Sequence, residues 1–430
     1  MGNNIKKRFA KNASWIVIGR VFQLVLTFVT TMLVARYLGP EKYGTITYTY
    51  SYVALFLPLC TLGMNDIVVK ELLDNKDKNN EILGSIFVLR FISSLLSIGF
   101  IYIVISLLNN NPVFTYIAFL QSLSLVFQIF DSIIYFYQSQ LLAKKTGIIF
   151  VIAYLLTAVF RITGLVIKRN TAWFAFAVSL DYLVVSILLL IRYFIDGNRL
   201  TFSINSCKKL LKRSSHYIFS GLMIVIYSKA DNIILGNMID ETTVGYYSAA
   251  TTLCNAWPFL LTAIIDSASP IIIDTYKENK KEYEKKIKQL YASVFYIALV
   301  VAILITLLSK VIVNILYGQN YMATVTPLRI VCWSTIFAYL GVARASWMQC
   351  ENKLKYEATL SFLGAVTNVV LNIVLIKHYG IIGAAFALLL TQFITNIVYV
   401  YLIKETRPNA KLILNAIMLK DIKNDDKKIN

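Results

Sequence analysis

Long apolar runs, separated by short polar stretches, recur along the whole 430-residue chain. A helix rises about 1.5 Å per residue, so roughly 20 residues cross the hydrocarbon core of a membrane. In lipid the backbone polar groups must be satisfied within each segment, which requires helices here because barrel strands are shorter and alternate. The pattern predicts an all-α polytopic membrane protein with about twelve spans, at 12–37, 42–65, 83–108, 112–137, 146–167, 171–194, 214–238, 243–267, 289–313, 322–348, 356–376 and 381–403.

The distribution of charge gives these spans an orientation. Hydrophobic residues make up 57% of the chain and charged residues 15%, against about 25% charged in a soluble domain. The net charge of +19 does not indicate a nucleic-acid binder, because the basic residues form no stripe interleaved with aromatic residues. Instead, 30 of the 42 Lys and Arg residues fall in alternate loops and 6 in the opposite loops. The positive-inside rule therefore places both termini in the cytoplasm.

The predicted outer loops are too short to hold a soluble catalytic domain, whereas the inner segments are longer and charged. Segments 66–82 and 268–288 are predicted to form amphipathic helices on the cytoplasmic surface, with a plain solvated connector as the alternative. The basic tail, residues 404–430, has an apolar middle; either it rests on anionic lipid or it is disordered.

An internal repeat divides the chain into an N-lobe, residues 1–200, and a C-lobe, residues 201–403, with six predicted spans each. The turn with Gly44 is matched by a turn with Gly245, and Pro58 is matched by Pro258. Six spans is an even number, so the halves are parallel repeats related by an axis along the membrane normal. Chance similarity is the alternative, but repeated halves enclosing a midplane site are typical of transporters.

Charged residues inside the predicted spans are the main candidates for function, because each costs several kcal/mol unless it is paired or hydrated. Arg161 and Asp181 lie at similar depth on consecutive antiparallel spans, which predicts a structural ion pair. Lys229 and Asp231 are about 200° apart around their helix and must find other partners. Arg90 and Arg344 lie nearer span ends and are predicted to extend toward the interface. The remaining charges within or at the edges of spans are Arg20, Asp131, Asp266, Arg329 and Glu357.

Arg20 and Lys229 are the strongest candidates for substrate contact. They occupy the first predicted span of each half, which a two-lobed transporter would place at its central cleft. Arg and Lys suit an anion, and Arg matches phosphate oxygens in a bidentate manner. Tyr48 and Tyr52 share one helix face and suit either a sugar ring or core packing. No P-loop, metal-ligand cluster or Ser/His/Asp set occurs.

The N-terminal K-K-R-F-x-K-N and the turn A-R-Y-L-G-P-E-K-Y-G (residues 35–44) give the chain a family likeness. It resembles the polysaccharide-transporter family of lipid-linked oligosaccharide flippases, the Wzx-type O-antigen and capsule repeat-unit flippases. These belong to the MOP exporter superfamily together with the MATE drug exporters. The turn is the most specific match, whereas the rest of the likeness is architectural.

The resemblance implies a multi-pass protein of the bacterial cytoplasmic (inner) membrane. Such a protein flips undecaprenyl-pyrophosphate-linked repeat units to the outer leaflet by alternating access, and is not an enzyme. It implies a cationic cavity lined by helices one, two, seven and eight, onto which Arg20 and Lys229 fall. Arg90, Arg161 and Arg344 complete our candidate cationic set.

The same resemblance bears on cofactors and partners. It implies no cofactor beyond H+ or Na+ coupling, for which Asp231, Asp266 and Asp181 are the candidates. The expected partners are the lipid-linked glycan, membrane lipids, and the polymerase and chain-length regulator of polysaccharide assembly, with no nucleic acid. Three alternatives remain: a MATE-like exporter of cationic drugs, a membrane-embedded polysaccharide polymerase or acyltransferase, and a non-transporting scaffold. A MATE-like cavity should be acidic, and a polymerase usually carries a large outer loop.

Overall fold

The computed structural model describes residues 2–108 and 111–420, except for the side chains at 2–14, 16–18, 20 and 66. Throughout this part of the chain the regular elements are helices, without a strand. The chain forms two compact units, residues 1–229 and 230–430. The predicted boundary near residue 200 falls in the linker before helix α9, whereas the compact units divide further along, inside that helix.

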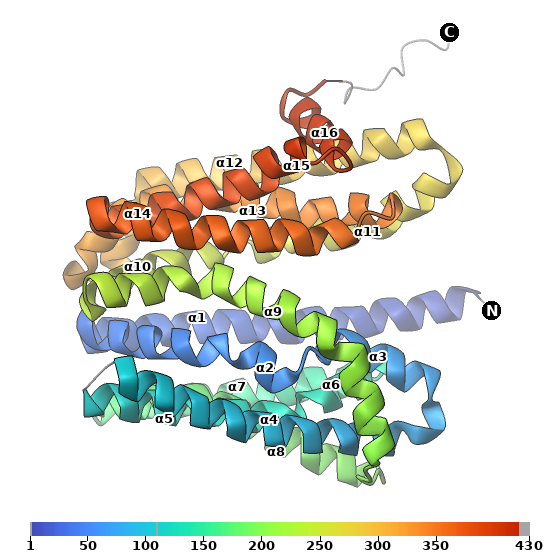
Figure 1. The fold of residues 1–430 in the computed structure, drawn as a ribbon, viewed down its shortest axis with the longest axis horizontal. Helices are drawn as coiled ribbons and strands as arrows, with labels where there is room; N and C mark the ends of the chain where they lie inside the picture. The colour runs from blue at the N-terminus through green and yellow to red at the C-terminus, as the bar shows by residue number, and fades with distance from the viewer. Residues whose placement is uncertain (1, 109–110, 421–430) are drawn as a thin grey trace. The chain divides into compact units, whose positions relative to one another are not determined.

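The first unit is drawn from blue to green in Figure 1. Its long helices pack side by side; α1 contacts α7 and α5, and α5 also contacts α8. A Cβ atom on Gly19 of α1 would lie only 3.3 Å from Cα of Gly147 in α7, so glycine permits a close helix contact here. The elements are α1 (Gly2–Leu55), α2 (Leu57–Thr61), α3 (Asn65–Asp74), the 3-10 turn η1 (Lys76–Lys78), α4 (Asn79–Leu108), α5 (Pro112–Phe127), the 3-10 turn η2 (Gln128–Asp131), α6 (Ser132–Ser139), α7 (Ala143–Val166), α8 (Thr171–Ile195) and most of α9 (Ile204–Met238).

The second unit continues from the end of α9 to the C-terminus. In it α13 packs against α12, α14 and α10, and α16 packs on α12. Its elements are α10 (Glu241–Asn255), α11 (Phe259–Glu278), α12 (Lys280–Leu316), the 3-10 turn η3 (Gln319–Thr324), α13 (Val325–Cys350), α14 (Lys355–Phe393), the π-helical turn η4 (Ile394–Val398), α15 (Tyr399–Leu402) and α16 (Arg407–Ile417).

Ten helical segments in the described part of the chain are long and apolar enough to cross a membrane. Two of them each contain two predicted spans. α1 turns sharply at Gly39, where φ is 77° and Pro40 follows, and α14 turns at Gly380, where φ is 58°. Only glycine adopts these angles readily, so both positions act as interhelix turns. The prediction of an all-α polytopic membrane protein with about twelve spans is confirmed.

The repeated prolines mark a helix break in each unit. α1 ends at Leu55 and Pro58 lies in the first turn of α2, while α10 ends at Asn255 and Pro258 caps α11. A proline lacks the backbone donor needed inside a helix, which accounts for both breaks.

The prediction of a separate surface helix at 268–288 is wrong. α11 continues to Glu278 and α12 begins at Lys280, so the segment is a helical hairpin. Asn279 makes this turn, because its side chain accepts hydrogen bonds from the backbone nitrogens of Lys281 and Glu282 at 3.0 and 3.2 Å. Segment 66–82 instead contains most of α3, η1 and the start of α4.

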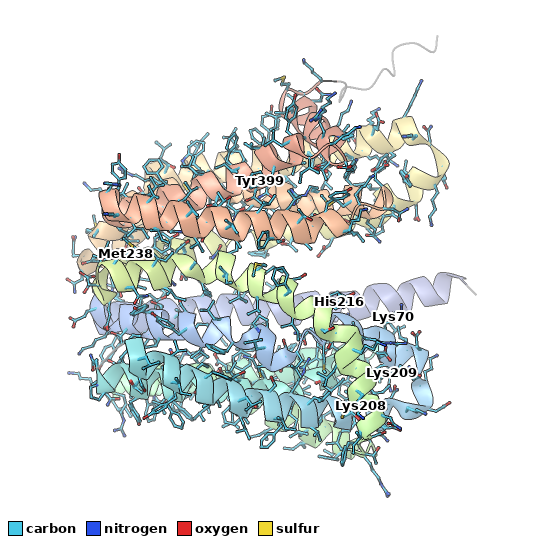
Figure 2. The ribbon with its side chains drawn as sticks, viewed as in Figure 1. Lys70, Lys208, Lys209, His216, Met238 and Tyr399 are labelled. Atoms are coloured by element: carbon cyan, nitrogen blue, oxygen red, sulfur yellow. The ribbon has the colours of Figure 1, made fainter. Side chains whose placement is uncertain are left out.

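The basic start of α9 is attached to α3. Figure 2 labels Lys208 and Lys209 on the first turns of α9 and Lys70 on α3. Glu71 of α3 is buried and forms ion pairs with Arg213 and, at 3.5 Å, with Lys209. These contacts fix the linker between the two halves against the first unit.

The described part of the basic tail forms helix α16 and docks on α12. Asn409 donates a hydrogen bond to the Tyr291 hydroxyl at 2.5 Å, and Tyr296 donates to the carbonyl of Ile417 at 2.8 Å. Residues 404–420 are therefore folded, which excludes the disordered alternative for that part of the tail.

Candidate functional site

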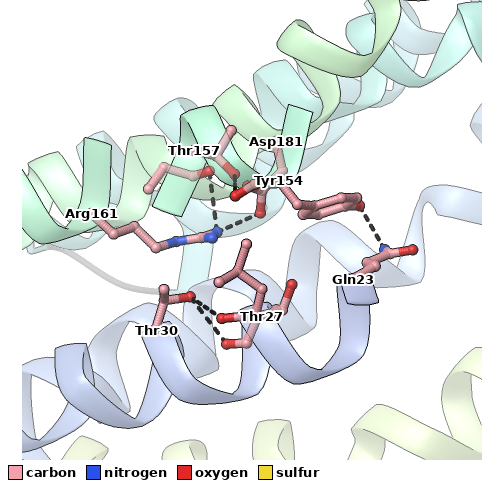
Figure 3. A network of polar contacts seen from close by, with 9 residues as sticks. Gln23, Thr27, Thr30, Tyr154, Thr157, Arg161 and Asp181 are labelled. Atoms are coloured by element: carbon pink, nitrogen blue, oxygen red, sulfur yellow. Dashed lines mark hydrogen bonds and ion pairs between the residues drawn. The ribbon is translucent and has the colours of Figure 1, made fainter. Parts of the chain in front are cut away.

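The predicted ion pair between Arg161 of α7 and Asp181 of α8 is confirmed. Both side chains are largely buried, and an Nη2 atom of the arginine donates to Oδ2 of the carboxylate. The same guanidinium also reaches the carbonyl of Ala177 at 3.5 Å. Figure 3 shows the pair facing α1, with Thr27 and Thr30 beside it. Opposite charges taken out of water together need this mutual contact, so the pair has a structural role.

The polar side of α1 next to this pair carries hydrogen-bonding groups that are not satisfied. Gln23 donates to the Tyr154 hydroxyl at 2.6 Å (Figure 3). Its other amide atom, Oε1, is buried and has no hydrogen-bond partner in the described part of the chain, and neither has Oγ1 of Thr27. Buried polar atoms normally find a partner, so these two suit water or a polar ligand.

Lys229 of α9 lies on the first unit's aromatic surface. Its Nζ atom is 5.8 Å from the ring centroid of Tyr50 in α1, within range of a cation–π contact. The hydroxyls of Tyr50 and Tyr182 share a hydrogen bond, and Tyr182 directly follows Asp181. Lys229 is partly exposed, unlike Arg161. It therefore combines a positive charge with access for a ligand.

Arg90 does not extend toward the interface as predicted. Its side chain is only 1% exposed in α4, and Nη2 donates to Oδ1 of Asn65 at 2.7 Å. Its Nε atom has no hydrogen-bond partner among the described residues. The prediction missed this burial because the partner, Asn65 at the start of α3, is 25 residues away along the chain.

The same prediction is wrong for Arg344, which is 3% exposed inside the second unit. Its Nε and Nη2 atoms donate to both oxygens of Glu357 at 3.3 and 3.1 Å, and Nη1 donates to Oδ1 of Asn396 at 3.1 Å. Asn396 lies on the π-helical turn η4. A bidentate carboxylate and an amide therefore satisfy this guanidinium, which gives it a structural role.

Asp231 of α9 is held by hydrogen bonds from uncharged side chains. The carboxylate is 5% exposed and accepts hydrogen bonds from the Tyr247 hydroxyl at 2.6 Å and from the amides of Asn368 and Asn372 at 3.0 and 2.7 Å. Within the described residues no ion pair reaches it. The Oδ1 atoms of Asn368 and Asn372 are buried there without hydrogen-bond partners. A buried carboxylate beside two unsatisfied amide oxygens has the donor chemistry of a site for a proton or a hard cation.

The remaining candidates lie elsewhere. Asp266 is exposed on α11, and Arg329 is exposed on α13 with its Nε atom 2.8 Å from Oγ of Ser309. Arg20 belongs to α1, but its side chain lies outside the described residues. Tyr48 and Tyr52 are buried against each other and against Phe114, with ring centroids 5.0 to 6.2 Å apart, which confirms core packing.

Sequence reasoning missed the polar residues around Asp231. Asn368 and Asn372 are separated by four positions in an otherwise apolar span, so they share one helix face. Two amides at this spacing in a membrane helix are a readable signal. Their distance from Asp231 along the chain, 137 and 141 residues, is what hid the association.

The sequence matches two families of membrane proteins. Residues 9–276 match the profile described as "Polysaccharide biosynthesis protein", and residues 217–374 match that described as "MatE". The chain is 21% identical over 400 residues to the capsular polysaccharide biosynthesis protein CapF of Staphylococcus aureus, covering 92% of this chain and 99% of the relative. It is 23% identical over 403 residues to a putative O-antigen transporter of Escherichia coli K12, covering 91% and 95% respectively.

Solved structures share this fold. An inward-facing multidrug resistance MATE family transporter of the MOP superfamily superposes with a TM-score of 0.72, at 15% identity, over 93% of this chain and 99% of the other. The lipid II flippase MurJ, in an inward closed conformation, superposes with a TM-score of 0.68, also at 15% identity, over 97% and 93%. At these identities the likeness establishes the MATE/MurJ-like fold.

Proposed function

Because this chain belongs to the polysaccharide biosynthesis protein family, we propose that it flips undecaprenyl-pyrophosphate-linked oligosaccharide repeat units across the bacterial cytoplasmic membrane. The movement runs from the inner to the outer leaflet by alternating access and supplies O-antigen, capsule or a related surface polysaccharide. The observation that carries the proposal is the similarity, along more than nine-tenths of the chain, to capsule and O-antigen proteins. The protein is a multi-pass membrane transporter rather than an enzyme.

Lys229 and Arg20 are proposed to contact the pyrophosphate. Lys229 is a partly exposed cation on a membrane-spanning helix, next to the ring of Tyr50. Arg161 and Arg344 are buried in ion pairs, so their charges are already compensated, and Arg90 is buried against Asn65. These three arginines are better suited to holding the helices in place than to binding a mobile anion.

Asp231 is proposed to bind the coupling ion, a proton or Na+. The carboxylate and the Tyr247 hydroxyl surround the site, and the amides of Asn368 and Asn372 now direct their nitrogens at the carboxylate. A bound cation would be held once these amides turn their unsatisfied oxygens toward it. A bound cation would supply the positive charge that compensates this carboxylate. Asp181 is less suited because Arg161 already neutralises it, and Asp266 is less suited because it is exposed.

The second candidate function is export of cationic drugs, favoured by the MatE match over residues 217–374. A cavity for cations should be acidic, whereas the predicted spans contain more basic than acidic interior residues.

If the chain is a flippase, we propose that a polysaccharide polymerase and a chain-length regulator act on the flipped unit as its functional partners.

The decisive experiment is complementation of a flippase-null strain that makes a defined repeat unit. Restored surface polysaccharide would support the proposal. Continued accumulation of the lipid-linked unit on the inner leaflet, with this protein present in the membrane, would refute it. Increased resistance to cationic drugs without restored polysaccharide would favour the exporter.

A further inference from the structure

A pocket of about 560 Å³ lies at the α7–α8 turn of the first unit, apart from the polar groups discussed above. Its walls come from three helices and one turn. Tyr116 projects from α5, Phe160 from α7 and Trp173 from α8, while Lys168 and Arg169 belong to the turn. Every lining residue lies within the first unit, and none is acidic.

The Phe160 and Trp173 rings form an aromatic wall of the pocket. The rings of Phe160 and Trp173 stack with centroids 4.2 Å apart and planes 6° from parallel. The indole Nε1 also donates to the carbonyl of Phe160 at 3.2 Å. A Cβ atom on Gly164 would lie 2.4 Å from that nitrogen, so the indole can approach α7 only because residue 164 is glycine. The stacked pair therefore occupies a fixed position.

Two adjacent cations sit at the rim of the pocket. The Arg169 guanidinium carbon lies 5.2 Å from the centre of the Trp173 ring, and the backbone carbonyl of Arg169 accepts a hydrogen bond from Tyr37 at 3.2 Å. Lys168 has a φ of 56°, an angle that non-glycine residues seldom adopt. Among the residues that the structure describes, neither cation joins an ion pair.

The surroundings of the pocket are apolar and exposed. Tyr116 and Ile167, which both line the pocket, are 55% and 48% exposed, and Val166, next to Ile167 in the chain, is 74% exposed. In a membrane protein such side chains face the acyl chains of lipids. The charge pattern predicts that this turn is on the outer side, where only 6 of the 42 basic residues lie. Lys168 and Arg169 are therefore two adjacent basic residues on a side of the membrane where basic residues are otherwise few.

We propose that this pocket binds an anionic phospholipid of the outer leaflet, of the phosphatidylglycerol type. Lys168 and Arg169 contact its phosphate, as basic residues at a membrane surface do with anionic headgroups. The Phe160 and Trp173 rings pack against the glycerol region, where an aromatic ring meets both polar and apolar lipid parts. The acyl chains follow the exposed apolar faces of α5 and α7. The site does not depend on the flippase proposal, since none of its residues has a role there.

Fluorescence of Trp173 tests the proposal directly. The full chain is placed in nanodiscs of phosphatidylcholine that contain an increasing fraction of phosphatidylglycerol brominated on the acyl chain near the glycerol or, in parallel, of phosphatidylcholine brominated at the same place. The contribution of Trp173 is the difference between the wild type and Trp173→Phe. We expect brominated phosphatidylglycerol to quench it at concentrations roughly tenfold or more below those of brominated phosphatidylcholine, because two cations attract the anionic lipid.

The matched variants remove equal charge at different places. The double variant Lys168→Gln/Arg169→Gln should lose the preference, whereas Lys310→Gln/Lys377→Gln, which changes exposed basic residues of the second unit on the predicted outer side, should keep it. Equal quenching by the two lipids in the wild type would overturn the proposal. A preference retained by the pocket double variant would also overturn it, since the cations would then not be responsible. Because the readout is binding rather than transport, it stays separate from the test of flippase activity.

Discussion

Asp181 in the first unit, which is largely buried, and Asp231 in the second, which is buried, have opposite electrostatic surroundings. Asp181 is joined to the buried guanidinium of Arg161, so the pair is neutral within itself. Asp231 is surrounded by a phenol and two amides, which donate hydrogen bonds but carry no charge. A buried carboxylate compensated by a fixed arginine has no need of a mobile cation, whereas one held by neutral donors favours binding a proton or a metal cation.

From this comparison we propose a division of the candidate residues into structural and functional charges. Arg344 follows Asp181, because Glu357 binds it through both oxygens. Lys229 is partly exposed, unlike the paired arginines, and we propose that it is accessible to a ligand. Changes at the paired residues should therefore lower stability, and changes at Asp231 and Lys229 should lower transport.

The largest effect is expected on breaking the Arg161–Asp181 pair from one side. Asp181→Asn leaves a buried guanidinium without its counter-charge and should cost about 3 to 5 kcal/mol of unfolding free energy. Arg161→Met/Asp181→Leu removes both charges and should cost less than the single change. Thermal unfolding in detergent measures both. If Asp181→Asn is as stable as the wild type, the structural role of the pair is wrong.

Asp231→Asn should have the opposite effect to Asp181→Asn. It should cost little unfolding free energy but strongly reduce transport. Asn368 and Asn372 can rotate their unsatisfied oxygens toward the new amide, so packing and hydrogen bonding survive. Flipping in proteoliposomes should fall roughly a hundredfold, which is about 2.7 kcal/mol, and should lose its dependence on the H+ or Na+ gradient. Unchanged transport with an unchanged ion dependence would exclude Asp231 from coupling.

Lys229→Ala and Arg20→Ala should each reduce flipping about tenfold, because each removes one of the charge-assisted contacts that we propose for the pyrophosphate. Lys229→Arg should retain part of the activity. Arg329→Ala is the matched control, since that arginine is exposed and hydrogen-bonded to Ser309. Membrane insertion is checked in parallel, and full complementation by both Lys229→Ala and Arg20→Ala would remove these residues from the substrate site.

The smallest effect concerns Asp196, which follows α8 outside the membrane-spanning segment. Burial opposes its ionisation, but hydrogen bonds from Lys145 and Tyr137 and the charges of Lys145 and Arg192 lower the pKa of this carboxyl overall. Its stabilisation is therefore present above the unfolded pKa of about 3.9 and is lost as the pH falls through the lower folded value. Asp196→Asn should cost about 1 kcal/mol at neutral pH.

Thermal unfolding across a pH series measures this contribution. The difference between wild type and Asp196→Asn should disappear as the solution is acidified below about pH 4. Asp74→Asn, at an exposed position of α3, is the control and should show no such difference. A constant difference at all pH values would show that Asp196 does not act through its charge.

Local patterns in the sequence were sufficient to predict the fold and the ion pair of Asp181, one of the two aspartates. Hydropathy predicted the spans, Gly39 and Gly380 mark turns that separate consecutive spans, and the A-R-Y-L-G-P-E-K-Y-G turn predicted the family, which the profile match confirms. Arg161 and Asp181 could be paired because they occupy adjacent spans at equal depth. A short loop limits where two neighbouring helices can meet, so the pairing followed from counting residues.

Contacts between helices far apart in the sequence could not be predicted from loop lengths and residue counts. The partners of Asp231 come from α10 and α14, and no loop length relates α9 to α14. Arg90 and Arg344 were misplaced because their depth along a helix was known but their neighbours were not. The hairpin at Asn279 was missed because two membrane helices extend well past the apolar residues that define their spans.

The π-helical turn at Ile394–Val398 should be visible in alignments of relatives as a difference in length. Such a turn is a bulge inside an α-helix that holds one residue more than the α-helical turn it replaces, and it is frequent at functional sites. Here the turn carries Asn396, which accepts a hydrogen bond from Arg344. Relatives that lack the arginine should often be one residue shorter in this segment, so the gap and the arginine should be gained and lost together across the lineage.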